Sequence, residues 1–290
     1  MILQAIALGD AYGAGFEFAP EPFVVTNNNP EKGYVQNPTH TSLQPGCYTD
    51  DTQSSIAMAA VMLKDMWTPM GVAKALLAAY KQDERPGYAS RYKALLDSCQ
   101  DAGDFLERIR PNSYRAGAAM RSIPVGLTRD VSVLLHRSIL HASITHATMK
   151  GITSAQAAAL MFHLLYYSKV DSPWTLISGL NSEIPGWDWG QSPVAASSIP
   201  NEGVPCVRAA IHVLSLSKTM TEVLYHAVSL TGDVDTVAAL AVPCAMYAPW
   251  ITDKTFPPRL VDELEVSEFG VPYLAALDRR LIATFKRDAS

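Results

Sequence analysis

The sequence predicts an all-α protein that folds as a single compact multi-helix domain spanning residues 1–290. Apolar residues recur with helical spacing along most of the chain, as at Ile56, Ala59, Ala60 and Leu63. The strict alternation that is typical of half-buried strands is nearly absent. No internal repeat, low-complexity segment or shift in composition marks a domain boundary, and 290 residues are enough to bury one large core.

The predicted helices follow one another along the chain, and several have a recognisable start. One begins directly after the sequence TDDT at residues 49–52. The next opens at Pro69 behind Thr68, because serine and threonine are favoured N-caps and proline is favoured in the first turn. Ser154 is expected to cap a later helix. The helices after the first are expected at residues 69–82, 90–99, 101–109, 130–143, 155–170, 204–217, 220–230, 236–250 and 271–285.

Three segments depart from the usual amphipathic pattern. Residues 236–250 are apolar on nearly every face, which predicts a buried central helix that is kinked or stopped at Pro243. Residues 21–46 and 184–203 lack helical spacing and are expected to be long surface loops, which tend to be functional. The second contains Trp187 and Trp189, for which a role as loop anchors is favoured over an adenine pocket.

Composition and charge exclude several classes of protein. The net charge of −5 and the absence of Lys/Arg runs argue against binding to a nucleic-acid backbone. Four widely separated cysteines indicate reduced thiols and a cytoplasmic location. No apolar run approaches the roughly 20 residues that a membrane span needs, so no membrane partner is expected. A monomer is favoured.

Acidic residues gather at three places in the chain. The sequence GDAYGAGFE contains Asp10 and Glu17. Two further clusters combine carboxylates with threonine hydroxyls at the start of an apolar helix: Thr49, Asp50 and Asp51, and about 180 residues later Asp233, Asp235 and Thr236. The simplest interpretation of each cluster alone is a helix cap, since Asp and Thr are preferred there and Asp50 with Gln53 resembles a capping box.

Two features favour a metal site over simple capping. One cap needs one acid, whereas each cluster has two, and the apolar helix after Asp233 places its start near the core. Lys and Arg are scarce around both clusters, so the buried charges need another compensating partner. Four carboxylates with hydroxyl and water oxygens form a hard, all-oxygen site suited to Mg²⁺ or Mn²⁺. No His/Cys cluster suggests zinc.

The motifs in their order resemble the ADP-ribosylglycohydrolase family, which includes the dinitrogenase-reductase-activating glycohydrolases. The resemblance rests on GDAYGAGFE, YTDDT, SYRAGAAMRSIPVGL, SITHATMKG and TGDVDTVAA, between about Ile2 and Val242. It implies an all-α fold with a binuclear metal cleft. It also implies hydrolysis of an ADP-ribosyl group from a modified side chain, so that the expected partners are ADP-ribosylated protein or ADP-ribose.

The resemblance also implies roles for particular residues. Two divalent cations, Mg²⁺ or Mn²⁺, are expected to be held by the two acid–threonine clusters, namely Thr49, Asp50, Asp51, Asp233, Asp235 and Thr236. The catalytic residues are expected to be Glu17, Asp50 and Asp235, with Glu17 transferring a proton or positioning water. Gly117, Ala118 and His146, the last paired with Thr145, are expected to bind substrate.

Two departures from the family pattern leave an alternative open. Where the family usually has G-N-G, this chain has Arg115-Ala116-Gly117, so any contact from the asparagine side chain is in doubt. Thr231 replaces a usual glycine, and it is strained if that position needs a positive φ. The alternative is therefore a catalytically weak ADP-ribose-binding pseudoenzyme or a crystallin-like structural relative. Among the linkages that could be cut, those to arginine and serine are favoured.

Overall fold

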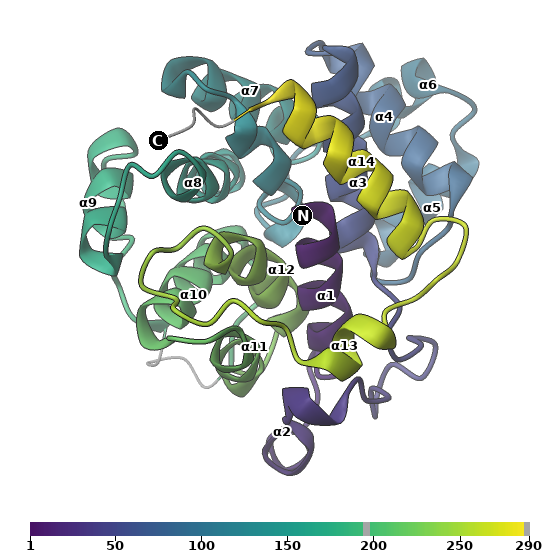
Figure 1. The fold of residues 1–290 in the computed structure, drawn as a ribbon. Coiled ribbons are helices and arrows are strands. Elements are labelled where there is room, and N and C mark those ends of the chain that lie inside the picture. Colours follow the sequence, from purple (N-terminus) through teal and green to yellow (C-terminus); the bar gives the residue numbers. More distant parts are fainter. Residues whose placement is uncertain (194–197, 287–290) are drawn as a thin grey trace.

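The structure is a computed structural model that describes residues 1–193 and 198–286, and it confirms the all-α prediction (Figure 1). Strand pairing within the described residues is limited to three isolated bridges. The α-helices are α1 Leu3–Ala14, α2 Glu21–Asn27, α3 Asp50–Lys64, α4 Pro69–Gln82, α5 Ser90–Ser98, α6 Ala102–Arg108, α7 Val131–Ser143, α8 Met149–Tyr166, α9 Pro173–Glu183, α10 Gly203–Leu216, α11 Met220–Ser229, α12 Val234–Ala245, α13 Pro258–Asp262 and α14 Val271–Thr284. Short 3₁₀ turns are η1 Pro30–Lys32, η2 Ala116–Ala118 and η3 Ile123–Leu127.

Helices α1 and α12 lie side by side at the centre of the molecule (Figure 1). Every residue of α12 is buried, as its all-round apolar sequence predicts. Two glycines on α1 allow the close contact: a Cβ on Gly9 would lie 2.5 Å from the carbonyl oxygen of Ala238, and one on Gly13 would lie 2.3 Å from the Cα of Asp235. The pairing therefore brings the C-terminal end of α1 against the first turn of α12.

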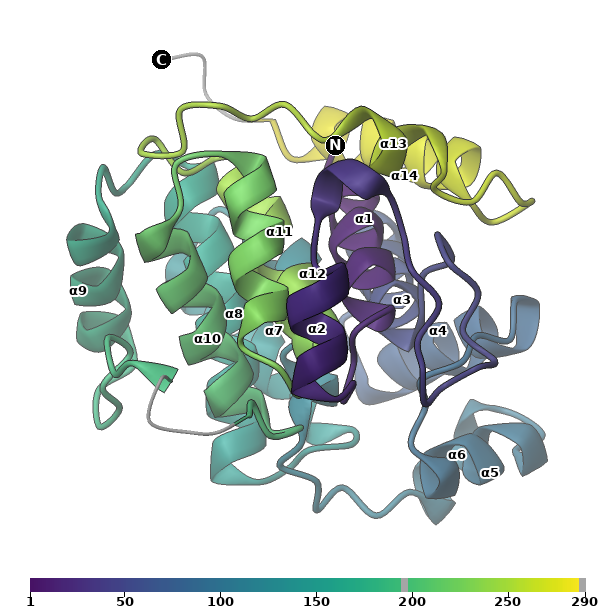
Figure 2. The ribbon, with the colours of Figure 1, turned by 90° about the horizontal axis from the view of Figure 1, so that it is seen from below.

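The other helices surround this pair. Helices α3, α10 and α11 pack against it, and α14 crosses over α1 and α3 near the C-terminus (Figure 2). Asp278 of α14 caps the start of α1, because its Oδ1 accepts hydrogen bonds of 2.8 Å from the backbone N–H groups of both Ile2 and Leu3. Helices α5 and α6 lie to one side of the main bundle (Figure 2).

Several helix boundaries differ from the sequence predictions. Helix α8 begins at Met149 with Thr148 as its cap, and Ser154 lies inside the helix, because Thr148 accepts a hydrogen bond from Gly151 N–H. The 21–46 segment includes helix α2, so it is not wholly a loop. Pro243 lies within α12, which continues to Ala245. Helices α1 and α9 were not predicted.

The 184–203 segment is a loop over its described part, and residues 194–197 lie outside the described residues. Trp189 is completely buried and its backbone N–H donates to Asn181, which confirms that it anchors the loop. Among the helices that the structure describes, none combines the length and the apolar character needed to cross a bilayer.

Candidate active site

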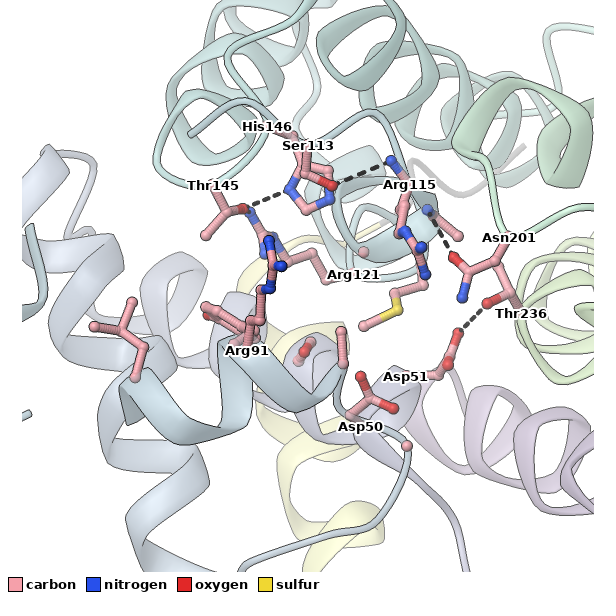
Figure 3. A pocket seen from close by; sticks show the side chains of 18 of the residues that line it. Asp50, Asp51, Arg91, Ser113, Arg115, Arg121, Thr145, His146, Asn201 and Thr236 are labelled. Carbon is pink, nitrogen blue, oxygen red and sulfur yellow. Dashed lines mark hydrogen bonds between the residues drawn. The ribbon is translucent and has the colours of Figure 1, made fainter. Parts of the chain in front are cut away.

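Five of the six acidic residues singled out in the sequence line one cleft of about 700 Å³, and Figure 3 labels Asp50 and Asp51 among them. Asp50 and Asp51 come from the first turn of α3. Asp233 precedes α12 and Asp235 lies in its first turn. Glu17 reaches the same cleft from the turn after α1. Two helix N-termini that are far apart in sequence therefore point their carboxylates into one space.

Hydroxyl groups tie the two clusters together. Thr236 Oγ1 donates to Asp51 Oδ1 at 3.0 Å, which joins the start of α12 to the start of α3. Thr49, rather than Asp50, caps α3, which begins at Asp50; Thr49 Oγ1 accepts from the N–H of Asp51. Gln53 does not complete a capping box, because its side chain instead bonds the backbone of Asp83 and the hydroxyl of Tyr88. Thr236 lines the cleft beside the carboxylates, whereas Thr49 is fully buried and is not part of the cleft wall.

Asp10 is a supporting residue whose role the sequence did not reveal. It is completely buried on α1 and accepts four hydrogen bonds from two threonines of the metal-site helix. Its Oδ2 accepts from the N–H of Thr49 at 2.9 Å, and from the N–H and Oγ1 of Thr52 at 3.0 and 2.6 Å. Its Oδ1 accepts from Thr49 Oγ1 at 2.9 Å. Asp10 thus satisfies amides at the start of α3 and fixes that helix to α1.

A glycine with an unusual backbone conformation lets Asp50 occupy its position. Gly87 has a φ of +105°, and a Cβ at this residue would lie 1.9 Å from Asp50 Oδ1. The Asp50 N–H donates to the carbonyl of Pro86 at 3.1 Å. Any larger side chain at residue 87 would therefore displace the carboxylate or the loop.

Thr231 adopts the strained conformation that was one of the two alternatives. Its φ is 56° and that of the next residue, Gly232, is 90°. A positive φ is a genuine outlier for a β-branched residue. The turn is held by Ile199, whose N–H donates to the Thr231 carbonyl and whose carbonyl accepts from Asp233 N–H, each at 3.0 Å. The strained residue therefore lies two positions before Asp233.

The carboxylates repel one another and are poorly solvated. Burial, followed by repulsion from Asp235, Asp233, Asp50 and Asp10, raises the pKa of Glu17 to about 10. Burial and the nearby Asp235 likewise raise the pKa values of Asp50, Asp51 and Asp233. Burial also raises the pKa of Asp235. These groups resist ionisation unless positive charge is supplied.

The donor set fits a hard divalent cation. One carboxylate oxygen from each of Glu17, Asp233 and Asp235 lies within 4.8 Å of the others. Asp50 and Asp51 line the same cleft as these three residues. Within the described residues the four aspartates form no ion pair with Lys or Arg, and Glu17 contacts only His40, at 3.4 Å. Oxygen-only donors with uncompensated negative charge match the preferences of Mg²⁺ and Mn²⁺.

The cleft also has a set of basic residues in its lining, here called the basic wall, which the sequence analysis missed. Five arginines line it and no lysine does: Arg91, Arg108, Arg110, Arg115 and Arg121. They come from three separate stretches of chain, so no local run of charge signals them. Arginine binds phosphate and carboxylate groups through paired N–H donors. The cleft therefore combines buried carboxylates with guanidinium groups.

The expected substrate-binding residues have different placements. Gly117 and His146 line the cleft, and a Cβ on Gly117 would lie 3.2 Å from His146 Nε2. Ala118 is completely buried and is not part of the cleft wall, so its side chain is not placed to contact substrate. The amide of Ala116 donates to Asn201 Oδ1 at 3.4 Å. Asn201, which the sequence analysis did not single out, thus brings an asparagine side chain to the turn whose own asparagine is missing.

Cys206 adds a polar contact beside the acids. Its Sγ donates to Asp233 Oδ2 at 3.2 Å, and burial with the neighbouring Asp233 raises the pKa of this thiol. Burial, with Glu265 nearby, raises the pKa of Cys47 to about 11. Raised pKa values keep both thiols protonated, so neither is activated as a nucleophile.

Comparisons with known proteins agree with this geometry. The sequence model of the ADP-ribosylglycohydrolase family matches residues 2–288. A search of curated proteins finds no match. Among solved structures, one titled "ADP-ribosylglycohydrolase-related protein complex" is similar, with a TM-score of 0.70 and 20% identity over 99% of this chain and 96% of that chain. This structural likeness supports the fold, and the match over nearly the whole chain shows that the protein belongs to the ADP-ribosylglycohydrolase family.

Proposed function

We propose that the protein is a metal-dependent hydrolase that removes ADP-ribose from a modified side chain, with arginine and serine linkages favoured. The observation that supports this is the set of buried carboxylates around one cleft, among which the four aspartates form no ion pair with Lys or Arg within the described residues. The basic wall suits the diphosphate of ADP-ribose. The site thus offers one region for the bond to be cut and another for the nucleotide.

The metal-binding residues in this proposal are the two acid–threonine clusters: Thr49, Asp50, Asp51, Asp233, Asp235 and Thr236. Two Mg²⁺ or Mn²⁺ ions bound there would offset the charge of the carboxylates, hold oxygen atoms of the ribose and water, and stabilise developing charge. Asp235 interacts with each of the other acids of the cleft. Its charge, in addition to burial, helps to raise the pKa values of Glu17, Asp50, Asp51 and Asp233.

The reaction in this proposal is attack of water at the anomeric carbon. A C–O bond forms to water as the bond from that carbon to the nitrogen or oxygen of the modified side chain breaks. Glu17 takes the proton that water loses, the leaving atom takes a proton from solvent, and Glu17 then returns its proton to solvent. Glu17 suits this role because it stands on its own turn, outside the two clusters, with its side chain only 14% exposed.

A test would incubate the protein with peptides carrying ADP-ribose on arginine or on serine. Release of ADP-ribose is expected with Mg²⁺ or Mn²⁺ and should disappear in the presence of a chelator. ADP-ribose should also raise the melting temperature of the metal-loaded protein and leave chelated protein nearly unchanged. Hydrolysis that persists without metal would refute the proposed chemistry.

The second candidate is an ADP-ribose-binding pseudoenzyme or a crystallin-like relative. It is favoured by one observation, the missing asparagine side chain at Ala116, which can impair phosphate contacts. Metal-dependent binding of ADP-ribose without hydrolysis of either peptide would support the pseudoenzyme. No binding at all would support the structural relative.

A further inference from the structure

Arg121 is a buried cation at the head of a hydrogen-bond network beside the cleft. It is 2% exposed, and within the described residues it forms no ion pair with a carboxylate. Its Nη2 donates to Thr145 Oγ1 and to the carbonyl of His141, each at 2.8 Å, and its Nε donates to His141 Nδ1 at 3.3 Å. Because a guanidinium can only donate, these contacts fix the direction of every hydrogen bond that follows.

One branch of the network ends on the protein. Since His141 Nδ1 accepts from Arg121, its proton is on Nε2, which lies 3.3 Å from Ser122 Oγ. The Ser122 hydroxyl in turn donates to the carbonyl of Ala118 at 2.7 Å. Every donor in this branch therefore has an acceptor within the fold.

The other branch ends in the cleft. Thr145 Oγ1 accepts from Arg121 and lies 2.6 Å from His146 Nδ1, the one acceptor that the described residues offer to the Thr145 hydroxyl proton. His146 Nδ1 therefore accepts, and the proton of the neutral ring is on Nε2. If Nδ1 carried the proton instead, the Thr145 hydroxyl would be left without an acceptor, which is costly for a buried group.

The free N–H of this branch faces the cleft wall near Gly117. His146 is 7% exposed, and no acceptor for its Nε2 occurs in the part of the chain that the structure describes. Burial and the charge of Arg121 lower the pKa of His146 to about 3. Figure 3 shows Arg121, Thr145 and His146 on the side of the cleft opposite Asp50 and Asp51. The ring is thus a neutral hydrogen-bond donor with a fixed orientation, and the described residues offer no acceptor for its Nε2–H.

We infer that Arg121 and Thr145 are positioning residues that hold His146 as a fixed Nε2–H donor to an anionic oxygen of the substrate. The inference rests on the proposed function for the identity of that oxygen, which is a phosphate oxygen of ADP-ribose. Arg115 and Arg121 line the cleft nearby and favour an anion at this place. This contact with the nucleotide does not require protonation of His146. Protonating the ring would remove the hydrogen bond from Thr145 and place a second cation beside Arg121.

The first test uses the wild-type protein, first without and then with a nucleotide ligand. Nitrogen-15 NMR of the histidine rings in metal-loaded protein should show His146 as the neutral Nε2–H form throughout pH 6 to 8. Addition of ADP should shift the Nε2 signal, and addition of adenosine should not. An Nδ1–H ring, or a ring that titrates in this range, overturns the positioning role. An unchanged Nε2 signal with bound ADP overturns the contact with phosphate.

The second test uses matched variants. Thr145→Val removes the hydroxyl at nearly constant shape, and Thr145→Ser keeps it. Thr145→Val should weaken ADP-ribose binding roughly tenfold, as expected for one hydrogen bond, and Thr145→Ser should restore it. In a His146→Phe background, Thr145→Val should cause no further loss, because its effect passes through the ring. Additive losses would show a merely structural role.

The outcomes separate this inference from the proposed function. Failure of metal-loaded wild-type protein to bind ADP-ribose would refute the proposed function and the phosphate contact together. The NMR experiment on ligand-free protein would still decide whether Arg121 and Thr145 fix the ring. If Thr145→Val does not fold, the ADP titration of the wild-type protein still decides whether His146 donates to phosphate.

Discussion

Asp10→Ala should damage both the stability of the protein and its metal site. Asp10 provides the acceptor for two buried amides, the N–H groups of Thr49 and Thr52, and for both threonine hydroxyls. These amides belong to the cap and the first turn of α3, where the helix itself offers no acceptor. Alanine leaves them without a partner in a fully buried place.

The size of the effect follows from the number of donors left unsatisfied. Each buried donor without a partner costs about 1–3 kcal/mol, so two amides predict a loss of about 2–6 kcal/mol in the free energy of unfolding. Water entering the vacated space would place the loss at the lower end. Natural domains have about 5–15 kcal/mol in total, so the variant should be clearly less stable.

Asp10→Asn is the matched control. Its carbonyl oxygen can replace Oδ2, which accepts three of the four bonds, and its amide can donate to Thr49 Oγ1 in place of Oδ1. It also removes a carboxylate near Asp235, whose repulsion, after burial, helps to raise the pKa of Asp10 to about 7. The expected loss is therefore within about 1–2 kcal/mol.

The assay is denaturant unfolding in the presence of a chelator, followed by calorimetric titration with Mn²⁺. Asp10→Ala should weaken Mn²⁺ binding by about 10–100-fold, the usual effect of losing a group that orients metal ligands. Asp10→Asn should bind within a few-fold of wild type. An alanine variant as stable as wild type, or an asparagine variant as damaged as alanine, would refute the role assigned to Asp10.

Three further predictions concern the acids themselves. Asp235→Asn should abolish hydrolysis and raise the melting temperature of the metal-free protein, because it relieves repulsion among buried carboxylates; full activity in a peptide-hydrolysis assay would contradict its role. Glu17→Gln should cut turnover by about 10²-fold or more and leave ADP-ribose affinity nearly unchanged, as steady-state kinetics and calorimetry can show. The stabilisation by Mn²⁺ should grow between pH 6 and 8. The raised pKa values of Asp10 (about 7) and Glu17 (about 10) mean that the metal-free fold is favoured at low pH and loses stability as pH rises. Melting curves with and without Mn²⁺ test this, and an equal shift at both pH values would count against it.

Local sequence signals were sufficient to locate the acid clusters. Thr49 and Asp233 each stand directly before an apolar helix, and excess acid without nearby Lys or Arg suggested a cation before any contact was known. The same local logic misplaced the start of α8, because Ser154 and Thr148 are both acceptable caps and only the fold chooses between them. It also missed α1, whose glycines argue against a helix in isolation but are required by the close contact with α12.

The basic wall could not be predicted in this way. Arg91, Arg108 and Arg121 belong to different stretches of chain, and each is an ordinary surface or helix residue until the fold brings them to one cleft. Asn201 illustrates the same limit. It lies 85 residues after Ala116 in the sequence, so no local pattern indicates that its side chain reaches the turn whose asparagine is absent. Convergence of this kind depends on tertiary packing, which leaves no spacing pattern.

The position of Glu17 depends on tertiary contacts that the sequence does not reveal. The sequence placed it near the metal only through a resemblance, and the turn that carries it is held by distant partners. Asn37 Nδ2 donates to its carbonyl at 3.0 Å, and the N–H of Phe18, whose φ is 48°, donates to the carbonyl of Gly232 at 2.9 Å. Because Gly232 directly precedes Asp233, this hydrogen bond ties the segment that carries Glu17 to the segment that carries Asp233. Unusual backbone conformations occur on both sides of this bond, at Phe18, Thr231 and Gly232, where the surrounding structure must hold them in place.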